Sequence, residues 1–172
     1  MFLNYIKEFS LKRILKNSFK VVNLSSSLTT IKSVGLLIDE SNFNETEKLI
    51  SEIVNNGIRK DNINVIIYKD KLNQNHVFSH PTFNNKHISW SGKFTEKVVS
   101  DFINQKFDLL ISYYNHEKSS LMIITNNSKA SFKVGFSEID KRLNHLMIDT
   151  KIENHKIFTF ELFKYLKILK KI

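Results

Sequence analysis

The sequence predicts a single α/β domain with a doubly wound, mostly parallel sheet, and two observations predict it. Short apolar runs without a polar face recur along the chain, as strands buried on both faces require. Segments with apolar residues at helical spacing separate these runs, and parallel strands need such crossovers. The central run is residues 109–112, within the stretch 107–116, because polar and aromatic residues follow it directly.

Size and composition are those of one globular domain. The 172 residues are 41% apolar and 25% charged, which separates the chain from disordered sequences. The absence of cysteine excludes a disulfide framework and a thiolate metal site. No apolar run reaches the length of a transmembrane helix, and the first residues lack the pattern of a signal peptide. We therefore expect a cytoplasmic protein without a transmembrane segment.

Five strands are predicted, in the spatial order 2-1-3-4-5 of a Rossmann-like or flavodoxin-like sheet. They are residues 33–38, 64–68, 109–112, 132–136 and 146–149. Residues 69–93 form a long irregular insertion with the only Pro and the only Trp of the chain. The sequence therefore predicts residues 31–172 as a Rossmann-like α/β domain.

Helices are predicted between these strands. One begins at Asn44, with Glu47 completing a capping box, and ends at Gly57. Thr95 caps a second helix, and residues 121–124 belong to a third. The C-terminal helix has one apolar face that we expect to dock on the sheet, made of Phe158, Leu162, Phe163, Tyr165, Leu166, Leu169 and Ile172.

Residues 1–30 are predicted to be a basic N-terminal helical extension and a linker. Residues 2–22 are helical but carry two opposite apolar faces, one with Phe2, Tyr5, Ile6 and Phe9, the other with Leu11, Ile14, Leu15 and Phe19. A helix lying on a membrane surface would keep one apolar face throughout. The helix therefore either breaks near Ser10 or packs on different partners along its length.

The positive charge lies at the two ends of the chain. The net charge is +9, of which residues 1–36 contribute +5, residues 155–172 contribute +4 and residues 37–154 contribute zero. This asymmetry indicates an anionic partner, either RNA or the ribosome or else an anionic membrane surface. The expected contacts, on one shared surface, are Lys12, Arg13, Lys16, Lys20, Lys164, Lys167 and Lys171. The alternative is that the lysines serve solubility alone.

A small-molecule site is the second hypothesis, at the point where the strand order reverses. In doubly wound sheets, ligands bind beyond the carboxyl ends of the strands at this switch point. The first and third predicted strands end in polar groups that can hold a ligand or transfer protons, namely Asp39, Glu40, Ser41, Asn42, Tyr113, Tyr114, Asn115 and His116. These residues make a small or degenerate enzyme the alternative to a binding protein. Alternatively, these residues have structural roles only: Asp39 and Ser41 cap the next helix, and the tyrosines cover the sheet edge.

Cofactor and metal motifs are absent from the sequence. With four glycines it has no G-x-G-x-x-G, G-x-x-x-x-G-K-[ST] or G-x-S-x-G pattern. The insertion holds His76, His80 and His87, whose spacing matches no zinc motif. We therefore predict no cofactor, no metal and no catalytic residue. Aromatic and basic residues in the insertion either stack on nucleic-acid bases or pin the loop to the domain, and they are Phe78, Phe83, Lys86, Trp90 and Lys93.

Several segments carry a resemblance to a known family. Residues 31–35, 107–114 and 128–135, with 142–144, resemble a domain-of-unknown-function family of short bacterial α/β proteins with a basic N-terminal helix. This resemblance implies no activity. A weaker similarity joins residues 107–137 to the N-terminal half of heptosyltransferase-type glycosyltransferases, and it implies a Rossmann-like fold. Taken together, the sequence predicts a non-catalytic binding protein of unspecified oligomeric state.

Overall fold

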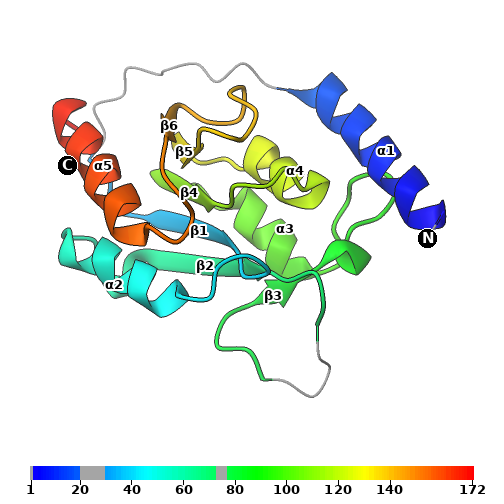
Figure 1. The fold of residues 1–172 in the computed structure, drawn as a ribbon, viewed down its shortest axis with the longest axis horizontal. Helices are drawn as coiled ribbons and strands as arrows, with labels where there is room; N and C mark the ends of the chain where they lie inside the picture. The colour runs from blue at the N-terminus through cyan, green and yellow to red at the C-terminus, as the bar shows by residue number, and fades with distance from the viewer. Residues whose placement is uncertain (1, 20–29, 73–76) are drawn as a thin grey trace.

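The computed structural model describes residues 2–19, 30–72 and 77–172, and in residues 2–4 the backbone alone. One parallel six-stranded sheet forms its centre, in the order β3-β2-β1-β4-β5-β6 (Figure 1). The strands are β1 (Val34–Asp39), β2 (Ile63–Tyr68), β3 (Thr82–Phe83), β4 (Leu109–Tyr113), β5 (Phe132–Phe136) and β6 (Leu146–Ile148). The predicted doubly wound α/β sheet is thus confirmed.

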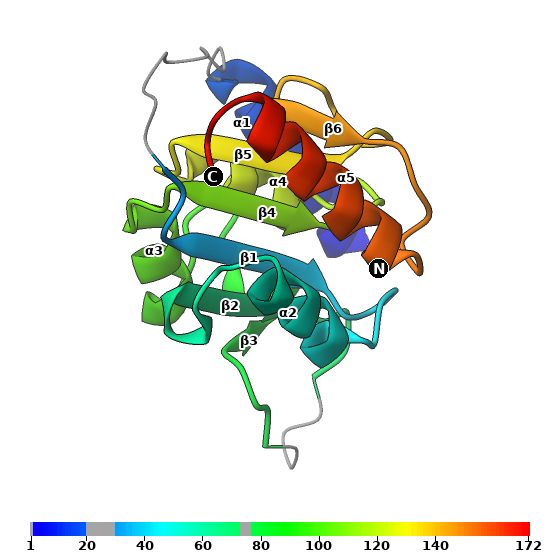
Figure 2. The same cartoon turned by 90° about the vertical axis from the view of Figure 1, so that its left-hand side faces the viewer.

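Helices cover both faces of this sheet. They are α1 (Phe2–Ser18), α2 (Thr46–Asn55), α3 (Lys97–Asn104), α4 (Ser119–Asn127) and α5 (His155–Ile168), with short 3₁₀ turns η1 (Lys60–Asn62) and η2 (Asn85–His87). In Figure 2, α2 and α5 lie in front of the sheet and α1, α3 and α4 lie behind it. Accordingly α2 packs on α5, and α1 packs on α4.

The predicted strand order is confirmed for the five longer strands. The structure adds β3, a two-residue strand inside the insertion that pairs with the end of β2. The sequence pattern did not reveal it, because so short a segment has no period of its own and follows Pro81, which has no N–H to donate. Since β3 pairs only with Ile67 and Tyr68, the first part of β2 keeps one edge without a neighbouring strand among the described residues.

The central strands are apolar because helices cover them on both sides. Every residue of β1, β4 and β5 is buried. The layers are close enough that Gly35 of β1 has no room for a side chain, since a Cβ there would lie 2.6 Å from Cδ2 of Phe107. The amino ends of β1 and β4 are therefore closely packed, and the loops that follow the carboxyl ends of these strands define the candidate site.

α1 is one continuous helix that uses only one of its two apolar faces for packing. Leu11 and Leu15 are buried, whereas Tyr5 is 74% exposed and Phe9 is 65% exposed. Of the two alternatives, a break near Ser10 or different partners along the helix, the break does not occur, and Tyr5 and Phe9 of the second face lie in solvent. Residues 20–29, which include Lys20 and most of the predicted linker, lie outside the described residues. The division of the chain at residue 30 therefore stays a prediction.

α5 docks on the sheet as its periodicity predicts. Phe158, Leu162, Phe163 and Leu166 are buried against the core. Three residues assigned to the same face lie at its margin and at the end of the chain, where Tyr165, Leu169 and Ile172 are 40%, 41% and 38% exposed. The outer side of α5 carries lysines together with exposed Phe160 and Ile168.

The two basic helices do not share a surface, contrary to the expectation from the charge distribution. α1 packs on α4 and α5 packs on α2, so they cover opposite faces of the sheet. Figure 1 shows them at opposite sides of the molecule. The physical reason is the direction of the crossovers, which place α2 on one face of the sheet and α4 on the other.

Neither predicted helix cap forms. α2 begins at Thr46 with Glu45 in the N-cap position, and Glu47 contacts His80 instead of completing a capping box. α3 begins at Lys97, and the Thr95 hydroxyl donates to the carbonyl oxygen of His87. Contacts with the insertion thus replace both caps.

Candidate functional site

The switch point between β1 and β4 is occupied by a buried carboxylate and its partners. Asp39, at the end of β1, has a side chain that is 1% exposed. Its oxygens accept hydrogen bonds from the Ser41 N–H and from Asn42 Nδ2, both at 3.0 Å. Lys118, in the N-cap position of α4, lies with Nζ 2.9 Å from Asp39 Oδ2. The charge of Asp39 is therefore neutralised inside the molecule.

Lys118 extends this network to the end of β2. Its Nζ donates to both oxygens of Asp70 at 3.0 Å and lies 4.6 Å from the ring centroid of Tyr68. The Tyr68 hydroxyl donates to Asp70 Oδ1 at 2.9 Å. Burial, and then the bond to Asp70, raise the pKa of Tyr68. Burial alone would raise the pKa of Asp70, but the bonds from Lys118 and Tyr68 outweigh it and hold that pKa below its ordinary value.

Sequence reasoning missed Lys118, although a signal for it exists. A carboxylate directly after a buried strand needs a nearby cation or several donors. Lys118 is the first cation after β4, the strand next to β1. A search for the counter-ion of Asp39 would therefore have found it.

The two tyrosines after the central strand are core residues. Tyr113 and Tyr114 have no exposed surface and point to opposite faces of the sheet, as successive strand residues do. The Tyr113 hydroxyl donates to the Ile152 carbonyl oxygen at 2.6 Å, and the Tyr114 hydroxyl lies 2.8 Å from Thr125 Oγ1. Burial raises the pKa of both phenols, so they stay neutral and serve packing.

The other predicted ligand residues are scattered around the switch point. His116 is exposed, and its Nδ1 lies 2.8 Å from Oδ1 of the neighbouring Asn115. The Ser41 hydroxyl accepts from the Asp70 N–H at 2.8 Å. The structure thus joins Asp39, Ser41 and Asn42 in one loop but gives the two tyrosines no access to a ligand. The structural alternative, in which Asp39 and Ser41 cap the next helix, is wrong: Asp39 closes the loop at residues 41 and 42, and no side chain caps α2.

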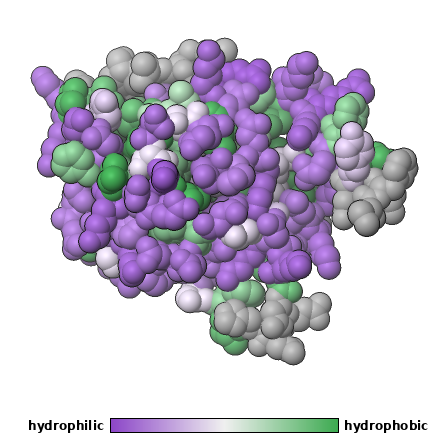
Figure 3. All heavy atoms as spheres, viewed as in Figure 1, coloured by the Kyte–Doolittle hydropathy of each residue, from purple (hydrophilic) through white to green (hydrophobic). Residues whose placement is uncertain are grey.

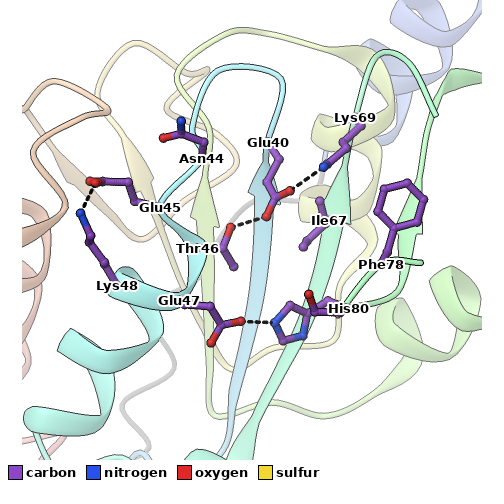
Figure 4. A pocket seen from close by; sticks show the side chains of 11 residues that line it. Glu40, Asn44, Glu45, Thr46, Glu47, Lys48, Ile67, Lys69, Phe78 and His80 are labelled. Carbon is purple, nitrogen blue, oxygen red and sulfur yellow. Dashed lines mark hydrogen bonds and ion pairs between the residues drawn. The ribbon is translucent and has the colours of Figure 1, made fainter. Parts of the chain in front are cut away.

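A cavity of about 470 Å³ opens beside the switch point, between the end of β2 and the start of α2 (Figure 4). Glu40 faces it and contacts Thr46 and Lys69, with Lys69 Nζ 3.0 Å from Glu40 Oε2. Glu47 Oε1 lies 2.8 Å from His80 Nε2. The remaining lining residues are Asn44, Glu45, Lys48, Ile67, Phe78 and Ser79.

This cavity does not suit a phosphate group. The N-terminus of a helix after the first strand is where doubly wound folds bind pyrophosphate. Here three carboxylates surround that position, on Glu40, Glu45 and Glu47, and each already has a basic partner. Among the described residues no group of three His, Asp or Glu is placed to hold a metal ion. His76 lies outside that part of the chain.

The outer side of α1 is different, because its charged and aromatic groups face solvent. The insertion runs beside this helix: Lys7 Nζ donates to the Asn85 carbonyl oxygen at 2.6 Å, and Ser10 Oγ to that of Trp90 at 3.2 Å. Trp90 is 47% exposed on this insertion, and Tyr5 and Phe9 are exposed on the helix itself. We call the group of exposed aromatic and basic residues here the α1 surface: Tyr5, Phe9, Lys12, Arg13, Lys16, Lys86, Trp90 and Lys93.

The cations of the α1 surface have no acidic partners on their own helix. Glu8 is the sole acidic residue of α1, and its carboxylate accepts from Ser119 Oγ at 2.7 Å on the inner side. Lys12, Arg13 and Lys16 are exposed, and no ion pair to another described residue holds them. Figure 3 shows hydrophobic patches over α1, at the right, and over α5, at the left, within a mostly hydrophilic surface. The α1 surface therefore offers free positive charge beside exposed aromatic rings.

The lysines of α5 and of the residues that follow it are less concentrated. Lys164 Nζ donates to Glu161 Oε2 at 2.8 Å, and Lys171 Nζ lies 5.1 Å from the ring centroid of Phe132. Lys167 is exposed. Since α5 lies on the other face of the sheet from α1, its lysines cannot add to the α1 surface.

Comparison with known proteins places the chain in a family. Residues 7–169 match a family described as "Family of unknown function (DUF6913)". The chain belongs to this family. The match begins within α1 and ends one residue after α5, so it covers α1 from residue 7 onward and all of α5. No curated protein and no solved structure matches the chain, so the weaker similarity to glycosyltransferases gains no support. Within the described residues, no helix has the length and hydropathy to cross a membrane.

Proposed function

We propose that this DUF6913 protein is a non-catalytic binding protein that contacts single-stranded RNA through the α1 surface. The observation that carries the proposal is the exposure of Tyr5 and Phe9 on the same helix as three cations without acidic partners there, with Trp90 exposed on the neighbouring insertion. The ion pairs at the switch point support it indirectly, since Lys118 pairs with both Asp39 and Asp70 and these groups leave little for an incoming ligand.

Two kinds of contact would contribute to binding. Lys12, Arg13 and Lys16 would neutralise phosphates and release their counterions, which makes the affinity depend on salt. Tyr5, Phe9 and Trp90 would stack on bases, each stack contributing about 1–3 kcal/mol. A single strand exposes its bases for such stacking, whereas a duplex does not.

The sequence predicted that both terminal helices contact the anionic partner. Because α5 lies away from α1, the proposal keeps α1 alone. Lys164 and Lys167 carry the same charge as the α1 cations but lie on the opposite face of the sheet. Together with Lys156 in the first turn of α5, they give a control that removes three positive charges, as many as Lys12, Arg13 and Lys16 carry, without touching the α1 surface.

The test is fluorescence anisotropy with a labelled single-stranded oligoribonucleotide. The variant Lys12→Gln/Arg13→Gln/Lys16→Gln should bind at least about tenfold more weakly at low salt, and the slope of log affinity against log salt should fall by about 2, at about 0.7 per lost phosphate contact. The matched variant Lys156→Gln/Lys164→Gln/Lys167→Gln should change the affinity by less than about threefold, through long-range steering alone. Equal losses in the two variants would show that net charge rather than the α1 surface holds the RNA.

The aromatic contribution has its own measurement. Phe9→Ser should weaken RNA binding while leaving the salt dependence unchanged, because it removes a stacking platform and no charge. An anionic membrane is the rival partner, since exposed aromatics and cations also suit a lipid interface. Flotation with phosphatidylserine vesicles, combined with no measurable RNA affinity, would contradict the proposal and favour the membrane.

A further inference from the structure

We infer that the free edge of β2 is a docking site for an extended peptide segment of a partner protein, which would add a strand to the sheet. β2 pairs with β1 along all six of its residues on one side. On the other side β3 pairs only with Ile67 and Tyr68. Residues 63–66 thus have no strand beside them among the described parts of the chain. This inference is independent of RNA binding, because the edge involves none of the residues of the α1 surface.

The direction of the backbone groups shows what this edge offers. Backbone groups of successive residues in a strand alternate between its two edges. The Tyr68 carbonyl oxygen accepts from Glu40 N–H on the β1 side, whereas Ile67 N–H donates to the Pro81 carbonyl oxygen on the β3 side. Val65, two residues before Ile67, therefore points its N–H and its C=O to the free edge. The Ile63 carbonyl oxygen points there as well, while the Ile63 N–H already donates to Lys60.

A groove runs beside this edge and would hold the side chains of an added strand. It has a volume of about 370 Å³ and lies between β2, Pro81 and α3. Its apolar lining includes Ile63, Val65 and Val98, of which Val98 is 41% exposed. Asp101 and Gln105 of α3 add polar groups to it. Backbone donors and acceptors beside an apolar groove are the recognition mode of strand addition.

The length of the free edge identifies the occupant. The edge without a neighbouring strand spans four residues, bounded by the 3₁₀ turn η1 (Lys60–Asn62) on one side and by Pro81 and β3 on the other. A second copy of this chain would bring its own η1 and β3 to the same short gap. A separate extended segment of about four residues fits without these elements, at about 3.3 Å per residue. We therefore assign the edge to a peptide with alternating apolar side chains.

The test removes one N–H from the edge. In Val65→Pro the lost N–H faces away from β1, and proline is tolerated on an edge strand when its missing N–H faces outward. The variant should therefore fold, with a melting temperature within a few degrees of the wild type. A phage-displayed library of random heptapeptides would be selected on the wild type and counter-selected on Val65→Pro.

Selected peptides should bind Val65→Pro at least tenfold more weakly by fluorescence anisotropy, while Val65→Thr, which keeps the N–H, should bind within threefold of the wild type. If Val65→Pro fails to fold, Val98→Lys on the exposed side of α3 takes its place, because it fills the groove without touching the sheet. If no selected peptide binds the wild type more tightly than these variants, the inference is wrong. A wild-type dimer in analytical ultracentrifugation that either variant dissociates would also overturn it, since a second copy would then occupy the edge.

Discussion

The switch point and the α1 surface contain similar kinds of side chain, but in opposite states. At the switch point, Lys118 pairs with both Asp39 and Asp70, and the side chains of Asp39 and Lys118 are largely hidden from water. On the α1 surface, Lys12, Arg13 and Lys16 extend into solvent beside exposed aromatic rings. Groups that satisfy each other contribute to the stability of the fold, whereas groups without partners remain available to another molecule.

This contrast explains why the position of polar residues after a buried strand misled the sequence analysis. The carboxyl ends of β1 and β4 do form the switch point that the rule requires. The rule places a ligand there only when the polar groups are free. In this chain Asp39 is not free, because Lys118 at the start of α4 already neutralises it.

The largest effect is expected from Lys118→Met. It would leave Asp39 as an uncompensated carboxylate whose side chain is 1% exposed, and loss of a buried partner costs about 3–5 kcal/mol. Urea unfolding should show a loss of about 4 kcal/mol, partly recovered in Asp39→Asn/Lys118→Met. Lys97→Met is the control, since the Lys97–Asp101 pair is exposed and should contribute less than about 0.5 kcal/mol. A small loss for Lys118→Met would mean that the switch point is open to water and to ligands.

The two faces of α1 give the second prediction. Leu11→Ala should lower the free energy of unfolding by about 3 kcal/mol, because it opens a cavity where α1 packs on α4. Phe9→Ala, two residues away on the exposed side, should change it by less than about 0.5 kcal/mol. If both variants were equally stable in urea unfolding, α1 would be an independent extension, as the sequence alone predicted.

Asp108 links the starts of β1 and β4, and its hydrogen bonds predict how the free energy of unfolding changes at acidic pH. Its Oδ2 accepts from the N–H groups of Lys32 and Ser33 at 3.0 and 2.9 Å. Burial alone would raise the pKa of Asp108, but these bonds outweigh it and hold the pKa below its ordinary value. Asp108→Asn should cost about 1.5 kcal/mol at pH 7, as expected for hydrogen bonds to a charged acceptor.

The sign of the pH dependence follows from proton binding. A carboxylate whose pKa is lower in the folded state binds fewer protons there, so its contribution is present at neutral pH and is lost as the pH falls from about 4 towards the folded value. Urea unfolding of the wild type and of Asp108→Asn should therefore converge on acidification. Asp61→Asn, at a side chain that is 85% exposed, should show no such convergence. A difference that stays constant down to pH 2 would contradict the assignment.

The smallest effect concerns the exposed cations. Lys12→Gln/Arg13→Gln/Lys16→Gln should leave the free energy of unfolding within about 0.5 kcal/mol of the wild type, because isolated surface charges contribute little. Thermal and urea unfolding check this. A stability loss of 2 kcal/mol or more would show that these residues serve the fold, and it would remove the basis for the α1 surface as an interface.

Much of the fold follows from local patterns. The strands Val34–Asp39, Leu109–Tyr113 and Phe132–Phe136 are apolar runs flanked by helical periodicity, and any chain with that alternation must cover both faces of a parallel sheet. β3 was not predicted, because a segment of two residues has no periodicity and its pairing depends on the end of β2. The role of Lys118 was not predicted, because it depends on Asp39, which lies 79 positions earlier in the sequence.

The sequence by itself determined the α/β class, the order of the longer strands, the buried face of α5 and the location of the positive charge at the chain ends. Only the tertiary structure decided which charges are free and which helices share a side. The physical reason is that burial and pairing depend on neighbours in space. A crossover can send two equally basic helices to opposite faces of one sheet without any change in their local sequence.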